Sequence, residues 1–335
     1  MAGARKPEEI VHESPAGGEE HTVLIGLSAA AVSVADERPR VLVVHRTEGP
    51  DALPFGTFDP LSHRTLESGL RNWVEEQTQL QLGYVEQLYT FGDRGRHMTR
   101  PGEGPRVLSV GYLALTRPQQ AHGPETLWRD WYGFFPWEDW REEKPAVIDA
   151  LITPRLAAFV GAATDAETRE RRKDRLRLCF GTDGLAWDEE KVLERYELMY
   201  EAGLVKEAQR DRKAAPAGGP VPALGADMVF DHRRILATAM GRLRGKMKYR
   251  PVVFELMPPE FTLLELQRTV EALSGIRLHK QNFRRLVEAQ GLVEGTGRLS
   301  RKSGGRPAEQ FRFRREVLRE RPAPGVRLTP TRFSR

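Results

Sequence analysis

The stretch Gly56–Gln81, GTFDPLSHRTLESGLRNWVEEQTQLQ, decides the fold predicted for the first part of this chain. An Asp-Pro loop follows its glycine, and a helical pattern begins near Arg64. One face of this helix carries apolar side chains that recur every three or four residues, namely Leu66, Leu70, Trp73 and Val74. Arg71 projects elsewhere, with Glu75 and Glu76 one turn further on. Such an arrangement suits a divalent cation beside a diphosphate.

This stretch resembles the Nudix box, a loop-helix motif whose carboxylates gather Mg²⁺ and activate water. The positions that fit the motif are Gly56, Arg71, Glu75 and Glu76. Asn72 stands where the first helix glutamate belongs, and Thr78 replaces the closing glycine. The loop is one residue too long, so Ser62 or His63 falls where the loop glutamate belongs. Because two carboxylates are missing, we predict a nucleotide pocket without reliable hydrolysis and no metal site, with Glu75 and Glu76 as residual metal candidates. The alternative is an ordinary amphipathic surface helix that carries Arg and paired Glu.

Composition indicates a globular protein of one large or two smaller domains. Hydrophobic residues make up 39% and charged residues 30% of the 335 residues, which argues against a disordered chain. The single cysteine, Cys179, excludes an intrachain disulfide and favours a reducing compartment. Residues 1–20 are polar, lack an apolar signal core and are predicted to be disordered. No stretch approaches the roughly 18 apolar residues of a membrane span, so we expect a cytoplasmic protein with no membrane partner.

Charge is distributed unevenly along the chain. Residues 276–335 contain 16 Lys and Arg against 5 Asp and Glu, whereas the rest contains 36 against 42. A basic end on an acidic body is typical of a module that meets a polyanion. A solvated, solubilising C-terminus is the alternative.

Four segments read as β-strands around the opening stretch: residues 21–34, 40–46, 86–92 and 106–116. The order of these strands, the loop and the helix resembles that of the Nudix α/β/α sandwich. This resemblance implies that the nucleotide lies between the sheet and the box helix. Arginine suits a diphosphate because its planar fork makes paired charge-assisted hydrogen bonds. The candidate effector-binding residues are therefore Arg46, Arg71, Glu75, Glu76, Asp93, Arg94 and Arg96. A plain surface charge is the alternative for each arginine.

Two further segments lie before the last part of the chain. Residues 128–140, WRDWYGFFPWEDW, are dense in aromatic side chains, which indicates packing in a core or an interface. Residues 141–222 read as a helical insertion that ends in a Pro/Gly linker. A contact between two subunits is the use that we expect for this insertion.

The C-terminal segment predicts a winged helix-turn-helix. Thr262 and Glu265 form a capping box before a helix over 263–272, and Gly275 lies in a short turn. A second helix over 279–289 is followed by two strand-like runs, which make a basic wing. Side chains of the second helix would read bases and those of the wing would contact phosphates. The candidate DNA-binding residues are Lys280, Gln281, Asn282, Arg284, Arg285, Arg298, Arg301, Lys302 and Arg306. A structural helical hairpin with a basic surface is the alternative.

The chain as a whole resembles the Nudix-related transcriptional regulators of NAD metabolism, the NrtR family, and its length and insertion resemble the long NadQ branch. The resemblance rests on YRPVVFELMPPEFTLLELQ (249–267), KQNFRRLVE (280–288) and GGRPAEQFRF (304–313). It implies an α+β chain with four parts: a disordered N-terminus (1–20), a Nudix-like effector-sensing domain (21–250, with the insertion and linker at 141–222), a winged helix-turn-helix (251–318) and a basic tail (319–335).

The resemblance also implies a function. We expect a homodimeric repressor that binds a double-stranded DNA operator of NAD biosynthesis or salvage genes and is not an enzyme. It would require no cofactor, and a nucleotide effector, ADP-ribose, NAD or ATP, with or without Mg²⁺, would change its DNA affinity. The competing hypothesis is an active Mg²⁺-dependent Nudix hydrolase of ADP-ribose or a related nucleoside diphosphate derivative, whose basic end merely binds nucleic acid.

Overall fold

The computed structural model describes residues 23–93, 106–119, 123, 125–212, 223–300, 307–320 and 325–326. The predicted disordered N-terminus and most of the predicted basic tail lie outside the described residues.

A mixed sheet forms the centre of the first part of the chain. Its strands are β1 (Val23–Ala35), β2 (Arg38–Val44), β3 (Phe55–Thr57), β4 (Tyr84–Phe91), β5 (Arg106–Leu115) and β6 (Thr126–Asp130). They lie in the order β4-β5-β1-β2-β6, with β3 paired to β1, and only the β1–β5 pairing is parallel. Strand β1 is central because its run from Leu27 to Val34 is small or apolar on both faces. The four strands predicted from the sequence are confirmed.

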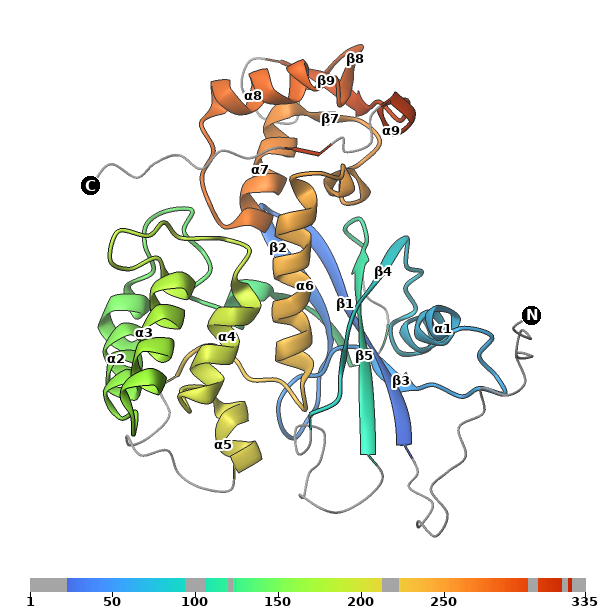
Figure 1. The fold of residues 1–335 in the computed structure, drawn as a ribbon. Helices are drawn as coiled ribbons and strands as arrows, with labels where there is room; N and C mark the ends of the chain where they lie inside the picture. Colours follow the sequence, from blue (N-terminus) through green and yellow to red (C-terminus); the bar gives the residue numbers. More distant parts are fainter. Residues whose placement is uncertain are drawn as a thin grey trace, which may run out of the picture.

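Helices cover both faces of this sheet (Figure 1). Helix α1 (Leu66–Thr78) packs Leu70 and Val74 against Leu27 and Ala29 of β1. Helix α6 (His232–Met247) covers the opposite face, where its apolar side chains join the main core. A Cβ at Gly111 of β5 would lie 2.9 Å from Ile235, so glycine permits this close approach. The predicted α/β/α sandwich is confirmed.

The segment between β6 and α6 is largely helical. It contains the 3₁₀ turn η2 (Trp131–Gly133), the π-helical turn η3 (Ile148–Ile152), α2 (Thr153–Gly161), α3 (Ala166–Phe180), α4 (Val192–Glu201) and α5 (Lys206–Arg212). Trp131, Phe135 and Trp137 are fully buried in the same core cluster as α6. The aromatic-rich segment is therefore core, and helix α4 of the insertion packs against α6, on the side of α6 away from the sheet (Figure 1).

The C-terminal part is a winged helix with a three-stranded sheet. After the 3₁₀ turn η4 (Val252–Glu255), its elements are β7 (Phe261–Thr262), α7 (Leu263–Ser274), α8 (Lys280–Ala289), β8 (Val293–Ser300), β9 (Ala308–Phe313) and α9 (Val317–Glu320), with strand order β7-β9-β8. The predicted capping box is present: the Thr262 amide donates to Glu265, and the Glu265 amide donates to Thr262 Oγ1. Gly275 ends α7 with a φ of 74°, a conformation that costs glycine little.

No helix within the described part of the chain is long and apolar enough to cross a membrane.

Candidate DNA-binding surface and nucleotide-binding region

Helix α8 has one polar face that is exposed to solvent and one apolar face that is buried. Phe283 and Val287 are buried against the rest of the winged helix. The five side chains predicted to read DNA, Lys280, Gln281, Asn282, Arg284 and Arg285, are all exposed. Arg284 Nε donates to Glu288 Oε1 at 2.9 Å in an exposed ion pair. Exposed pairs contribute little to stability, so this guanidinium can exchange its partner for a base or a phosphate.

The wing places one predicted phosphate contact among the described residues. Arg298 of β8 is exposed, and its Nη1 donates to Glu260 Oε1 at 2.9 Å. Arg301, Lys302 and Arg306 lie in 301–306, outside the described residues. The wing hairpin carries a register shift between Gly295 and Leu299.

One buried carboxylate fixes the turn between α7 and α8. Glu271 Oε1 accepts from the Leu278 amide at 3.0 Å and from Gln267 Nε2 at 2.8 Å. Its Oε2 accepts from Arg268 and Arg277, both at 3.0 Å. Burial alone would raise the pKa of Glu271, but these hydrogen bonds, led by that from the Leu278 amide, lower it below the ordinary value of 4.5.

A second buried carboxylate holds an arginine that joins the body to the winged helix. Glu138 receives two hydrogen bonds from Arg195 of α4, at 2.6 and 2.8 Å, and one from Arg244 of α6, at 2.7 Å. All three side chains are fully buried. Arg244 Nε also donates to the Leu273 carbonyl of α7, at 3.0 Å. Burial raises the pKa of Glu138, but the two guanidinium groups outweigh it, so the net direction is down.

The sequence did not predict either carboxylate. Glu138 is separated from Arg195 by 57 residues and from Arg244 by 106, so no local periodicity relates them. Glu271 sits on the inner face of a predicted helix, and a charged residue at such a position was the one available signal.

In the box region, Arg71 is held by its own surroundings. Its guanidinium donates to Glu67 at 2.9 Å and to the backbone carbonyls of Leu82 and Gly83, at 2.5 and 3.1 Å. It thereby ties α1 to the start of β4. Glu75 and Glu76 are both exposed on α1.

The loop before α1 is packed rather than open. His63, one of the two residues predicted near the position of the loop glutamate, accepts from the Asp59 amide through Nδ1 at 3.1 Å. Trp73 lies on Gly56, where an added Cβ would be 2.2 Å from the indole ring. Trp73 Nε1 also donates to the Thr57 carbonyl, at 3.0 Å. Among the residues that the structure describes, no group of three or more His, Cys, Asp or Glu is placed to hold a metal ion.

The remaining effector candidates do not all gather beside α1. Arg46 is exposed in the loop after β2. Asp93 pairs with Arg234 of α6, which covers the face of the sheet opposite to α1. Arg94 and Arg96 lie outside the described residues.

The sandwich and its C-terminal domain together define a protein with a Nudix-like fold joined to a winged helix. Residues 253–313 match the family model of the NrtR DNA-binding winged helix domain. The chain thus carries an NrtR-type winged helix on a body with a Nudix-like fold, which confirms the predicted resemblance to NrtR proteins, whereas the likeness to the NadQ branch stays a prediction.

One curated relative matches over part of the chain. The ADPR responsive transcriptional repressor NtrR of Acinetobacter baylyi is 44% identical over 91 residues, which cover 27% of this chain and 36% of the relative. The match therefore spans about a third of that relative's length.

Solved structures share the fold. Shewanella oneidensis NrtR complexed with a 27mer DNA aligns with a TM-score of 0.52 and 20% identity, over 88% of this chain and 95% of that one. A MutT/nudix family protein from Enterococcus faecalis aligns with a TM-score of 0.50 and 15% identity, over 92% and 94%.

Proposed function

We propose that this protein is a DNA-binding transcriptional repressor of NAD biosynthesis or salvage genes. Its Nudix-like domain senses a nucleotide effector (ADP-ribose, NAD or ATP). The observation that carries the proposal is helix α8, which lies in a domain that matches the NrtR winged helix. Its apolar side is buried, and its exposed side carries Lys280, Gln281, Asn282, Arg284 and Arg285. Arginine pairs with guanine edges and Asn or Gln with adenine, which is the chemistry of a helix in the major groove.

The partner is a double-stranded operator, bound by two copies of the chain. A homodimer would present two α8 helices to a pseudo-palindrome with half-sites one helical turn apart. The wing residues Arg298, Arg301, Lys302 and Arg306 would add salt-dependent phosphate contacts.

The effector would be held rather than consumed. The name of the A. baylyi relative, ADPR responsive, makes ADP-ribose the first candidate. The proposed effector-binding residues are Arg46, Glu75, Glu76, Arg94 and Arg96, with Mg²⁺ as an optional companion at Glu75 and Glu76. Arg71 and Asp93, which the sequence also predicted, instead bond the Leu82 and Gly83 carbonyls and Arg234, respectively. Since Asn72 and either Ser62 or His63 stand where a hydrolase has carboxylates, a role without turnover is favoured. The ligand would act by favouring one of two conformations that differ in DNA affinity.

The decisive experiment is binding-site selection from random duplexes with the full-length protein, followed by footprinting upstream of NAD-synthesis genes. Binding should be abolished by Arg284→Ala with Arg285→Ala and retained by Glu75→Gln. Turnover of ADP-ribose with Mg²⁺ that collapses on Glu75→Gln would support the hydrolase instead. If no promoter is bound more tightly than random DNA at physiological salt, the repressor assignment is wrong.

A further inference from the structure

The turn between α7 and α8 is bonded to the body as well as to its own domain. The Trp140 amide donates to the Gly275 carbonyl at 2.7 Å, and Trp140 and Ile276 form a parallel β-bridge. The segment that leads into the insertion therefore pairs directly with the turn that sets the position of α8.

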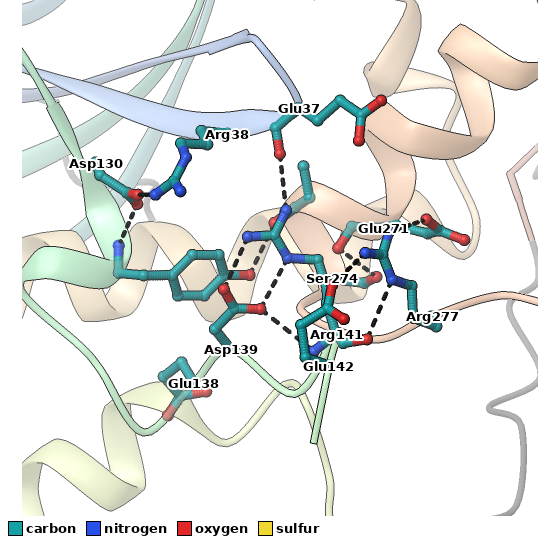
Figure 2. A network of polar contacts seen from close by, with 12 residues as sticks. Glu37, Arg38, Asp130, Glu138, Asp139, Arg141, Glu142, Glu271, Ser274 and Arg277 are labelled. Carbon is teal, nitrogen blue, oxygen red and sulfur yellow. Dashed lines mark hydrogen bonds and ion pairs between the residues drawn. The ribbon is translucent and has the colours of Figure 1, made fainter. Parts of the chain in front are cut away.

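Arg277 joins these two sides with all three of its guanidinium nitrogens (Figure 2). On the winged-helix side, Nη1 donates to Glu271 Oε2 at 3.0 Å. On the body side, Nε donates to the Arg141 carbonyl at 3.1 Å, and Nη2 pairs with Glu142. Helix α8 begins at Lys280, three residues further on.

The body side of this contact reaches the central sheet. Arg141 Nη1 donates to the Glu37 carbonyl at 2.7 Å, and its other nitrogens are held by Asp139 at 2.7 and 2.8 Å. Glu37 lies in the tight turn between β1 and β2 and approaches Arg268 of α7 to 3.8 Å. Figure 2 shows the path from Glu37 through Arg141 to Arg277. A displacement of this hairpin would therefore move the contacts of both α7 and the turn that follows it.

The contact lies outside the covalent path between the two parts. The chain passes from α6 to the winged helix through η4, which precedes α7. The turn at 275–278 follows α7. Its bonds to the body therefore form a second connection between the body and the winged helix, directly before α8.

We propose that Arg277 is a positioning residue that transmits the conformation of the Nudix-like body to α8 and so couples effector binding to DNA affinity. The inference rests on the proposed function. Its chemistry is specific to arginine because lysine offers a point charge and cannot bond three partners in one plane.

The test compares DNA affinity with and without ADP-ribose in the full-length protein. Fluorescence anisotropy on the selected duplex gives a coupling ratio, defined as the Kd with saturating ADP-ribose divided by the Kd without it. Couplings between sites usually amount to about 5-fold to 150-fold. We expect Arg277→Met and Arg277→Lys to bring the ratio to within about twofold of one, while calorimetry still detects ADP-ribose binding. A ratio equal to that of the wild type in both variants would overturn the inference.

Two further variants separate coupling from general damage. Glu142→Gln removes only the exposed partner of Arg277 and should move the ratio in the same direction by a smaller factor. Arg298→Met, in the wing, should weaken DNA binding equally with and without ADP-ribose and leave the ratio unchanged. Equal shifts of the ratio in Arg298→Met and Arg277→Met would contradict a specific role for Arg277.

A measurement without DNA tests this inference independently of the proposed function. If the wild type binds no promoter, the repressor assignment fails, and hydrogen exchange of residues 275–289 decides the coupling. A change in that exchange on adding ADP-ribose, present in the wild type and lost in Arg277→Met, supports the inference. The same change in both proteins, or no change in the wild type, overturns it.

Discussion

Glu138→Gln tests the buried ionic contact most directly. The substitution keeps the shape of the side chain and removes the carboxylate that pairs with Arg195 and Arg244, two fully buried guanidinium groups. Three hydrogen bonds of 2.6–2.8 Å lose their charged acceptor. Each bond to a charged group contributes about 1.5–3 kcal/mol, and removing one partner of a buried ion pair costs about 3–5 kcal/mol. Because glutamine can still accept from one arginine, we expect the free energy of unfolding to fall by about 3–5 kcal/mol rather than by the sum.

Urea denaturation followed by tryptophan fluorescence measures this change. Trp187 reports on the site because the Arg195 guanidinium lies 3.7 Å from its ring centroid. The matched control is Glu288→Gln, which removes the carboxylate of an exposed pair with Arg284 and should cost less than about 1 kcal/mol. If the free energy of unfolding of Glu138→Gln lies within about 1 kcal/mol of that of the wild type, the ion pairs of Glu138 do not stabilise the protein.

Three other outcomes are expected. The pKa values of Glu138 and Glu271 lie below 4.5 in the folded protein, so their stabilisation is present above about pH 4.5 and is lost as the pH falls through the folded values. Urea titrations should therefore show the wild type and Glu138→Gln converging in stability as the pH is lowered from 7 towards 3. Gly56→Ala forces Trp73 to move and should lower the free energy of unfolding by about 1–3 kcal/mol. Gly133→Ala is the control, because the space around Gly133 is open, and it should cost under about 1 kcal/mol when both variants are compared by thermal denaturation. Thr262→Ala removes the N-cap of α7 and should cost about 0.5–2 kcal/mol, and an unchanged melting temperature would rule out a stabilising cap.

Local signals in the sequence predicted most of the elements. The capping box at Thr262 and Glu265 and the glycine at 275 define α7, and the four-residue spacing of Phe283 and Val287 places them on the inner face of α8. Strand β1 was predictable because a long apolar run cannot lie at an exposed edge. In each case, neighbours within a few residues determine the backbone.

Contacts between distant segments were not predictable. Arg71 fits a phosphate-binding motif, yet its donors are taken by backbone carbonyls of the following segment, which only folding brings near. Asp93 and Arg234 are 141 residues apart and meet because α6 covers the sheet beside the end of β4. The bonds between Trp140 and the turn at Gly275 likewise have no signal in sequence spacing.

The β-bridge between Trp140 and Ile276 limits how the winged helix can be exchanged between proteins. A winged helix moved to another body with residues 253–313 as its limits would leave behind the backbone that Gly275 and Arg277 bond. The graft would also leave the Leu273 carbonyl of α7 without Arg244 Nε, which donates to it in the intact protein. A working chimera would need residues 137–142 from the same parent, and substitutions at positions 142 and 277 should arise together during divergence. The unit that can be exchanged is therefore discontinuous in the chain.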